Sequence, residues 1–376
     1  MMSIRYSPLR AMVAWVGALV MVAGGLTGCA KEKGKDAEKG LVVGFLYVGP
    51  KDDFGYNQAQ ALGAGDVKKM AGVTVKEAEN IPESKDCQKV MKGMVETDGA
   101  KLIFPTSYGY FKPHTIDMAT KYPDVLFVHC GGFWEPGMPN NVRTYFGYID
   151  ECEYVSGIVA AHATKSKKLG FVAAKKFSQV RRNINAFAMG ARSIDPSITV
   201  TVIFTGEWSM PAKEAEATSA LLDQGIDVIT CHVDSPKVVV EAAEKRNCKV
   251  CGYHASQAEI APKGYLTGAE WNWGKVFVDY VTTMKDGKSM GDNHNVRGGM
   301  KEGIVKMSPY TAQVTPEARK AADAVKDQLM AGTFMIFKGP LKDNTGKEVI
   351  PSGTSYPQSA PQLETMDYLV EGVIGN

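Results

Sequence analysis

Residues 41–69 read LVVGFLYVGPKDDFGYNQAQALGAGDVKK, a short apolar run followed by a loop and a longer amphipathic run. The run 41–48 is apolar almost throughout, which is typical of a strand buried on both faces of a sheet. The segment 56–69 has the length and pattern of a helix. A buried strand followed directly by a helix is the repeating unit of a parallel sheet, so this region predicts an α/β fold.

The same alternation continues along the chain and then starts again after Asp150. A helix predicted at 151–165 opens the second series. The predicted strands of the first series are 41–48, 73–79, 102–106, 125–130 and 142–148, and those of the second are 169–174, 198–204, 228–232 and 249–253. Two series with one rhythm predict two similar lobes, each a doubly wound parallel sheet, with a cleft between them.

The two series of predicted strands define the expected domain organisation. Lobe 1 is expected at 41–149 and lobe 2 at 150–265. Residues 266–340 are expected to return to the first lobe and to make further crossings between the lobes. The segment 341–376 is rich in Gly, Pro and Ser, and we expect a loop-like cover with little regular structure.

The first 28 residues are predicted to be an export signal. Arg5 and Arg10 are followed by an apolar run at 11–23, which is too short to span a membrane. The sequence Leu-Thr-Gly-Cys ending at Cys29 resembles the bacterial lipoprotein box, in which the cysteine is acylated and the chain is cut before it. We therefore expect a lipid anchor on Cys29, a hydrated tether at 29–40 and a location in the cell envelope, outside the cytoplasm. The alternative is an ordinary signal peptide with an incidental cysteine.

Composition and motifs favour binding over catalysis. The 43 basic and 41 acidic residues give a net charge of +2, which offers no basic surface for nucleic acid. The sequence has no phosphate-binding P-loop, no Gly-x-Gly-x-x-Gly after a strand, no His-Glu-x-x-His and no Gly-x-Ser-x-Gly. We expect no enzyme activity and no cofactor.

The cysteines give no metal motif. Cys248 and Cys251 are three positions apart on a predicted strand, so their side chains point to opposite faces and cannot share a metal ion. No disulfide pairing can be deduced for the cysteines that follow Cys29. We expect most of them to be small, buried apolar residues.

Aromatic and polar residues gather just after the predicted strands, where ligands of parallel sheets bind. Flat rings in a cleft suit a flat ligand, because stacking on an aromatic side chain is worth about 1 to 3 kcal/mol per base. Carboxyl and amide groups beside the rings could read the edge of that ligand, although Asp234 could equally cap a helix. The candidate ligand-binding residues are Tyr56, Asn57, Tyr108, Trp208, Asp234, Trp271 and Asn272.

The chain resembles the basic membrane protein family of substrate-binding lipoproteins, the relatives of PnrA-type purine nucleoside receptors. The resemblance extends over about 300 residues. It is carried by five short motifs that occur in the same order along the chain as in the family: GYNQ at 55–58, FPTSYGY at 104–110, NAFAMGA at 185–191, NWG at 272–274 and FKGP at 337–340. It implies a periplasmic-binding-protein fold of the first type, which closes on a ligand by a hinge and docks on an ABC-type permease.

The resemblance also implies a site in which a purine lies between one ring from each lobe. Tyr56 matches the ring of the first lobe, Trp208 is our choice for the second, and Asn57 matches an asparagine that faces the base. Nucleoside receptors of the family carry an aspartate and a lysine where this chain has His254 and either Glu270 or Trp271. The partners of the ribose are therefore absent.

We expect a receptor for a free purine base such as adenine. The alternatives are a receptor for purine nucleosides or for another flat nitrogenous solute. A nucleoside hydrolase that uses Asp52, Asp53 or Asp234 as a base is a further alternative, although the aspartate cluster that would bind calcium is missing.

Overall fold

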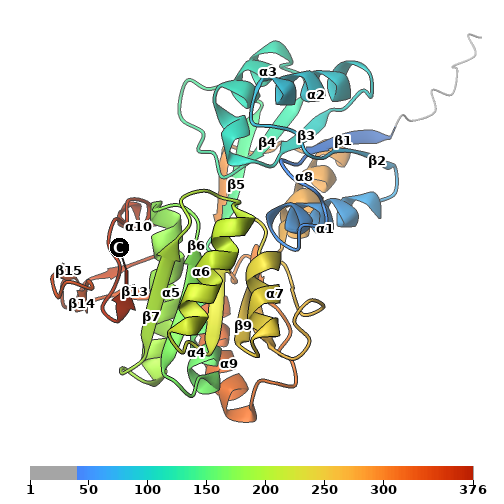
Figure 1. The fold of residues 1–376 in the computed structure, drawn as a ribbon. Helices are drawn as coiled ribbons and strands as arrows, with labels where there is room; N and C mark the ends of the chain where they lie inside the picture. Colours follow the sequence, from blue (N-terminus) through green and yellow to red (C-terminus); the bar gives the residue numbers. More distant parts are fainter. Residues whose placement is uncertain (1–39, 376) are drawn as a thin grey trace, which may run out of the picture. The chain divides into compact units, whose positions relative to one another are not determined.

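The computed structural model describes residues 40–375, which Figure 1 shows as two lobes, each built around one sheet. The predicted export signal, Cys29 and residues 29–39 of the predicted tether lie outside the described residues. Within residues 40–375, none of the helices is both long and apolar enough to cross a membrane.

The first sheet follows the predicted alternation of strands and helices. Its strand order is β11-β5-β4-β3-β1-β2, and all neighbouring strands are parallel. The central strands are buried on both faces, which explains their continuous apolar sequences. The strands are β1 (Leu41–Leu46), β2 (Val73–Ala78), β3 (Leu102–Pro105), β4 (Leu126–Cys130), β5 (Val142–Gly147) and β11 (Asn295–Gly298).

Helices cover both faces of this sheet. Helix α8 (Trp273–Lys285) brings the ring of Phe277 within 5.1 Å of Phe45 and 4.5 Å of Phe104, as measured between ring centroids. Phe45 and Phe104 belong to neighbouring strands, so these aromatic contacts fix α8 to the middle of the sheet. Helix α1 (Tyr56–Lys68) packs beside α8. Helices α2 (Lys85–Glu96) and α3 (Ile116–Lys121) contribute to a second cluster of buried apolar side chains in the same lobe.

The second sheet has the strand order β12-β10-β9-β8-β6-β7-β17. Within this sheet, as far as the structure describes it, only β12 runs antiparallel to its neighbour. The strands are β6 (Lys168–Ala173), β7 (Thr199–Phe204), β8 (Val228–His232), β9 (Lys249–His254), β10 (Tyr265–Trp271), β12 (Val305–Met307) and β17 (Val373–Ile374). The carboxyl ends of β6 to β10 therefore gather at one edge of the sheet.

Two helices of the second lobe touch through their backbones. A Cβ atom at Gly157 of α4 (Asp150–Ala163) would lie 2.1 Å from the carbonyl oxygen of Phe187. A Cβ atom at Gly190 of α5 (Ser178–Ile194) would lie 2.0 Å from the carbonyl oxygen of Tyr154. Glycine is required for this close approach, which fixes α5 on α4. The remaining helices of the lobe are α6 (Pro211–Asp223), α7 (Lys237–Lys245) and α9 (Pro316–Ala331).

The segment after residue 265 differs in part from the prediction. Helix α8 and strand β11 do return to the first lobe, and the chain passes between the sheets after β5, β10 and β11. Strand β10 and helix α9 stay with the second lobe, so the prediction that the strand at 266–270 returns to the first lobe is wrong. The physical reason is that β10 is buried along its whole length and pairs in parallel with β9, which extends the second sheet.

The C-terminal segment contains short strands, one short helix and loops. The strand pairs are β13 (Phe337–Lys338) with β16 (Ser355–Tyr356) and β14 (Leu341–Lys342) with β15 (Glu348–Ile350), and α10 (Pro361–Glu364) follows them. The last strand, β17, pairs in parallel with β7. The tail is thereby attached to the edge of the second sheet.

The six cysteines of the described region are buried and unpaired, so the prediction that they act as small apolar residues is confirmed. Burial also raises the pKa of the Cys248 thiol to about 12. Within residues 40–375, no group of three or more His, Cys, Asp or Glu side chains could hold a metal ion.

Candidate ligand-binding site

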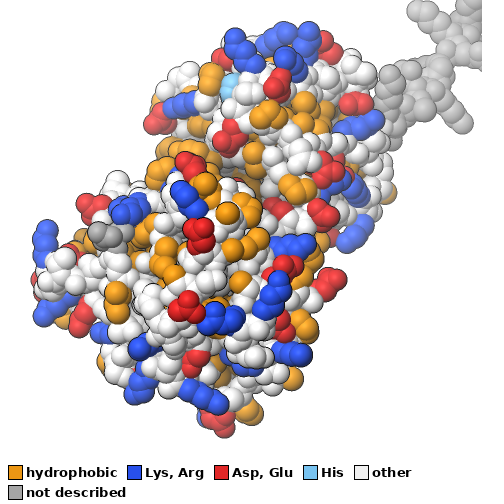
Figure 2. Space-filling view, viewed as in Figure 1, with side chains coloured by type: hydrophobic (Ala, Val, Ile, Leu, Met, Phe, Trp, Pro, Cys, Tyr) orange, Lys and Arg blue, Asp and Glu red, His pale blue; other side chains and the backbone are white. Residues whose placement is uncertain are grey.

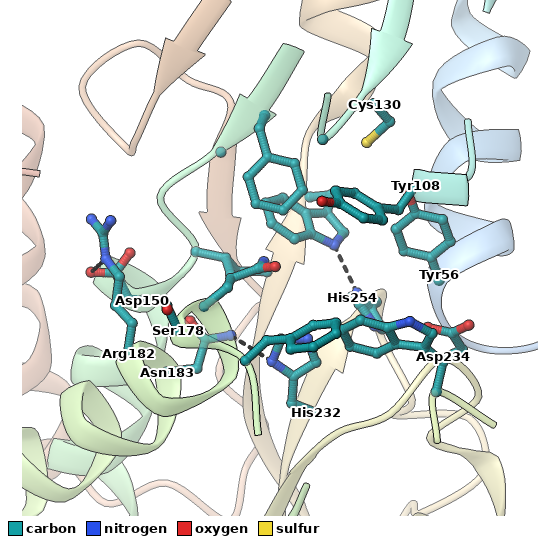
Figure 3. A pocket seen from close by; sticks show the side chains of 18 of the residues that line it. Tyr56, Tyr108, Cys130, Asp150, Ser178, Arg182, Asn183, His232, Asp234 and His254 are labelled. Carbon is teal, nitrogen blue, oxygen red and sulfur yellow. Dashed lines mark hydrogen bonds and ion pairs between the residues drawn. The ribbon is translucent and has the colours of Figure 1, made fainter. Parts of the chain in front are cut away.

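A cavity of about 640 Å³ lies between the carboxyl ends of the two sheets. Its volume falls in the range of small-molecule sites, which is roughly 300 to 1,000 Å³. Figure 3 shows Tyr56 and Asp234 at one end of it and Asp150 and Arg182 at the other. We call the first the ring end, formed by Tyr56, Trp208, Asp234, His254 and Trp271, and the second the polar end, formed by Asp150, Ser178, Arg182, Asn183, Leu363 and Glu364.

The ring of the first lobe, Tyr56, is positioned by the start of α1. The carboxylate of Asp53 accepts hydrogen bonds from the backbone N–H groups of Gly55, Asn57 and Gln58 at 2.8 to 3.0 Å. These are the free donors of the first helical turn, so Asp53 fixes the turn that carries Tyr56. The hydroxyl of Tyr56 donates to the carbonyl of Thr106, which follows β3.

Asp234 joins the rings of the two lobes through its main chain. Its backbone N–H donates to the carbonyl of Trp208 at 2.8 Å, and its own carbonyl accepts from the N–H of Tyr56, also at 2.8 Å. Trp208 follows β7 and stacks on His232, with 6.0 Å between the ring centroids and 29° between the planes. The ammonium of Lys175 lies 5.7 Å from the centroid of the Trp208 ring. Asp234 therefore connects the backbone segments that carry the two rings.

Trp271 and His254 form a hydrogen-bonded pair at the ring end, beside Tyr56. The indole N–H of Trp271 donates to Nδ1 of His254 at 2.7 Å. An indole nitrogen can only donate, so Nδ1 of His254 must accept and the imidazole proton lies on Nε2. Burial lowers the pKa of His254 well below its usual value, with His232 adding to the effect. The Tyr56 ring meets His254 edge-on at 5.5 Å and 77°.

Trp271, and not Glu270, faces the cavity. Glu270 accepts a hydrogen bond from the hydroxyl of Ser308 and lies 3.4 Å from the ammonium of Lys306, away from the site. Of the two residues that could match the second position of the ribose-holding pair, only Trp271 therefore lines the cavity, and its indole is hydrogen-bonded to His254.

Two of the predicted binding residues lie outside the cavity. Asn57 is buried, and its amide donates to Asp53 at 2.8 Å and accepts from the N–H of Gly49 at 3.2 Å. Asn272 precedes α8, and its amide donates to the carbonyl of Gly303 at 2.7 Å. Both amides are used within the protein, so the expectation that they face the ligand is corrected.

Tyr108 lies at the rim of the cavity. Its side chain is 66% exposed although it lines the site, and it begins a short helical turn after β3. Phe133 and Phe177 are also exposed large apolar side chains, and Phe177 lines the cavity from the second lobe. On the face shown in Figure 2, hydrophobic side chains gather where the lobes meet.

The polar end was not predicted from the sequence. Nε of Arg182 lies 3.1 Å from the carboxylate of Asp150, and both side chains are buried. The same guanidinium donates to the carbonyl of Gln358 at 3.0 Å and lies 3.5 Å from the carboxylate of Glu364. Arg182 thus holds the C-terminal tail against the cavity, where Leu363 and Glu364 line it.

Asn183 connects the polar end to the ring end. Its amide donates to Nδ1 of His232 at 3.0 Å and to the hydroxyl of Tyr253 at 2.8 Å. Burial lowers the pKa of His232 to about 3, so this imidazole is neutral. His232 is therefore a buried histidine whose Nδ1 lies within hydrogen-bond distance of the Asn183 amide. A polar residue on the buried face of an amphipathic helix was the available signal for Arg182 and Asn183.

The sequence is similar to one known protein family and to several named proteins. Residues 41–336 match the family described as ABC transporter substrate-binding protein PnrA-like. A purine-binding protein of Brucella abortus (strain 2308) is 34% identical over 357 residues, which is 94% of this chain and 98% of the relative. A nucleoside-binding protein of an ABC transporter from Lactococcus lactis is 31% identical, over 64% of this chain and 72% of the relative.

Solved structures share the fold. An ABC transporter solute-binding protein from Conexibacter woesei superposes with a TM-score of 0.65 at 19% identity, over 78% of this chain and 97% of that one. The predicted fold class, two parallel-sheet lobes of the periplasmic-binding-protein kind, is confirmed. With the family match over most of the chain, the conclusion is that this protein belongs to the PnrA-like family of ABC transporter substrate-binding proteins.

Proposed function

We propose that this substrate-binding protein receives a free purine base and holds it at the ring end of the cavity. The observation that carries the proposal is the backbone link through Asp234, which ties Tyr56 of the first lobe to Trp208 of the second. Both rings line the cavity, and the space between them is the slot that we propose for a planar heterocycle, because stacking on an aromatic ring is worth about 1 to 3 kcal/mol per base. The similarity to a purine-binding protein supports the same ligand class.

The replacement of the ribose partners favours a base over a nucleoside. His254 and Trp271 stand at the two positions, and the indole N–H of Trp271 is used in a hydrogen bond of 2.7 Å to Nδ1 of His254, which leaves Nε2 of the imidazole without a partner among the described residues. Neither side chain is a free charged group that could hold sugar hydroxyls. A buried site that does not hydrogen-bond a hydroxyl gives no gain for the desolvation of that hydroxyl.

A purine nucleoside is the second candidate, favoured by one observation. The cavity of about 640 Å³ continues from the ring end to the polar end, so it has room beyond a bicyclic base. Asn183 and Ser178 could accept or donate hydrogen bonds there.

Calorimetry decides between the candidates. The full chain is titrated with adenine, guanine, hypoxanthine and the corresponding nucleosides. The proposal expects saturable binding of at least one free base that is tighter than binding of its nucleoside. Binding of nucleosides alone would contradict it, and release of free base from a nucleoside would show an enzyme instead.

Attachment to the membrane is a separate part of the proposed function. The family assignment implies a permease as partner, and we propose that an acyl group on Cys29 holds the receptor at the extracytoplasmic side of the membrane. Expression of the full chain and of Cys29→Ala, followed by detergent partitioning and intact mass measurement, tests this. An unmodified Cys29 in the mature protein would refute it.

A further inference from the structure

Asp234 is held by its main chain and leaves its carboxyl group free. Its N–H and C=O are both used to join Trp208 and Tyr56, at 2.8 Å each. The carboxyl group makes no hydrogen bond or ion pair to any residue between 40 and 375, although the side chain is partly buried and lines the cavity. An unpaired carboxyl beside the slot between the two rings is placed to meet the edge of whatever lies in that slot.

The other charged groups around Asp234 already have partners. From the first lobe, Asp53 holds the start of α1, and Glu83 accepts from the N–H of Gly109 at 2.7 Å. From the second lobe, Glu214 accepts from the N–H of Met210 at 2.7 Å, and Lys175 lies 2.7 Å from the carboxylate of Glu207.

The two imidazoles nearby, His232 and His254, are neutral because burial lowers the pKa of both. The charge of Lys175 lowers the pKa of Asp234, but burial and the neighbouring acids Asp53, Glu83 and Glu214 outweigh it. The charge state of Asp234 is left to the pH and to the ligand.

We infer that Asp234 reads the edge of the bound base, and that its protonation state selects which edge is accepted. The neutral carboxylic acid pairs with an edge that has one donor and one acceptor, as in adenine. The carboxylate pairs with an edge that has two donors, as in guanine. This inference rests on the proposed function and names its specificity-determining residue.

The chemistry of the two edges is distinct. Adenine offers an exocyclic amine as donor beside a ring nitrogen as acceptor, and asparagine binds this pattern with two hydrogen bonds. A protonated aspartate has the same arrangement of one donor and one acceptor. A carboxylate has acceptors alone, which complement the N1–H and exocyclic amine of guanine. Burial and the neighbouring acids Asp53, Glu83 and Glu214 raise the pKa of Asp234 to about 7, so both forms are populated near neutral pH.

The experiment is titration calorimetry of the full chain with adenine and with guanine, between about pH 6 and pH 8.5. Adenine affinity is expected to be constant below about pH 7 and to fall by up to tenfold for each further pH unit. Guanine affinity is expected to rise over the same range. Repeating the titration in buffers of different ionisation heat should show uptake of about one proton when adenine binds above pH 7.

Asp234→Asn separates the charge from the shape. It is expected to bind adenine with a pH-independent affinity and to lose guanine binding by at least tenfold. Glu83→Gln, a second cavity carboxylate, is the matched control: it should keep the loss of adenine affinity at high pH, with the midpoint moved to lower pH because one acid that raises the pKa of Asp234 is neutralised. Adenine binding that is flat with pH, without proton uptake, would overturn the inference alone. Failure of every base to bind would overturn the proposed function as well.

Discussion

The two ends of the cavity are built in different ways. The ring end is assembled from the start of α1, the loops after β7 and β8 and the last residues of β9 and β10, so both lobes contribute and one main-chain link through Asp234 joins them. The polar end is built from the starts of α4 and α5 and from the C-terminal tail, held together by Arg182. The difference indicates that the ring end depends on closure of the lobes, whereas the polar end is a fixed part of the second lobe.

The largest expected effect comes from blocking the contact between the lobes at the ring end. A Cβ atom at Gly55 would lie 2.0 Å from the carbonyl oxygen of Asp234, so Gly55→Ala forces the two backbones apart. We expect base affinity to fall by about a hundredfold, since the slot cannot close. Gly65→Ala in the same region of chain is the control, because its Cβ meets no atom within 4 Å. Equal calorimetric affinities for both variants would contradict the closure of the ring end.

Removal of one ring is expected to have the next largest effect. Trp208→Ala should weaken binding by at least tenfold while the protein still folds, because the indole is only partly buried. Phe177→Ala is the matched control, since this ring touches Trp208 at 5.5 Å but is 50% exposed. It should change affinity less than threefold. A Trp208→Ala variant that fails to fold by circular dichroism would show that the ring belongs to the core.

A change at the polar end should alter stability more than affinity. Arg182→Met leaves Asp150 buried without its partner, which costs about 3 to 5 kcal/mol of unfolding free energy, as for other broken buried pairs. Base affinity should fall only a few-fold, and hydrogen exchange should increase in the tail near Gln358. Arg181→Met, the neighbouring arginine, is the control. A loss of base affinity as large as that of Trp208→Ala would remove the distinction between the two ends.

The smallest effect on binding is expected at Glu151, which lies behind the polar end. Its carboxylate accepts from the N–H of Met300 at 2.7 Å and from the amide of Gln358 at 3.3 Å. Burial raises the pKa of Glu151 to about 7. The protonated form of Glu151 therefore contributes to the free energy of unfolding in full below about pH 4, and this contribution is lost as the pH rises through 7.

Glu151→Gln should flatten this part of the pH profile, measured by urea unfolding, by about 3 kcal/mol at most. It should leave base affinity unchanged, with wild-type protein at each pH as the reference. An unaltered pH profile would show that Glu151 is not the titrating group.

Much of the ring end could be predicted because its residues directly follow predicted strands. Tyr56, Trp208, Asp234 and Trp271 all line the cavity for that reason. The predicted ligand contact of Asn57 is wrong because a local sequence pattern does not distinguish an amide that faces a ligand from one that faces a neighbouring carboxylate. Here the Asn57 amide nitrogen lies 2.8 Å from the carboxylate oxygen of Asp53.

The polar end could not be predicted because its parts are far apart in sequence. Arg182 and Gln358 are separated by 176 residues, and no local pattern near residue 358 indicates that it meets a helix of the second lobe. The same limit applies to β10, whose apolar sequence predicts a strand but not the sheet that it joins. In both cases a contact between distant segments decides the structure.

The pairing of β17 with β7 determines to which half of the molecule the C-terminal wall of the cavity belongs. The tail is tied to the second sheet at its last residues and by Arg182 near its middle, so Leu363 and Glu364 travel with that half. The walls given by α5 and the tail therefore belong to one half of the molecule, whereas Tyr56 and the exposed side chain of Tyr108 line the same cavity from the other half.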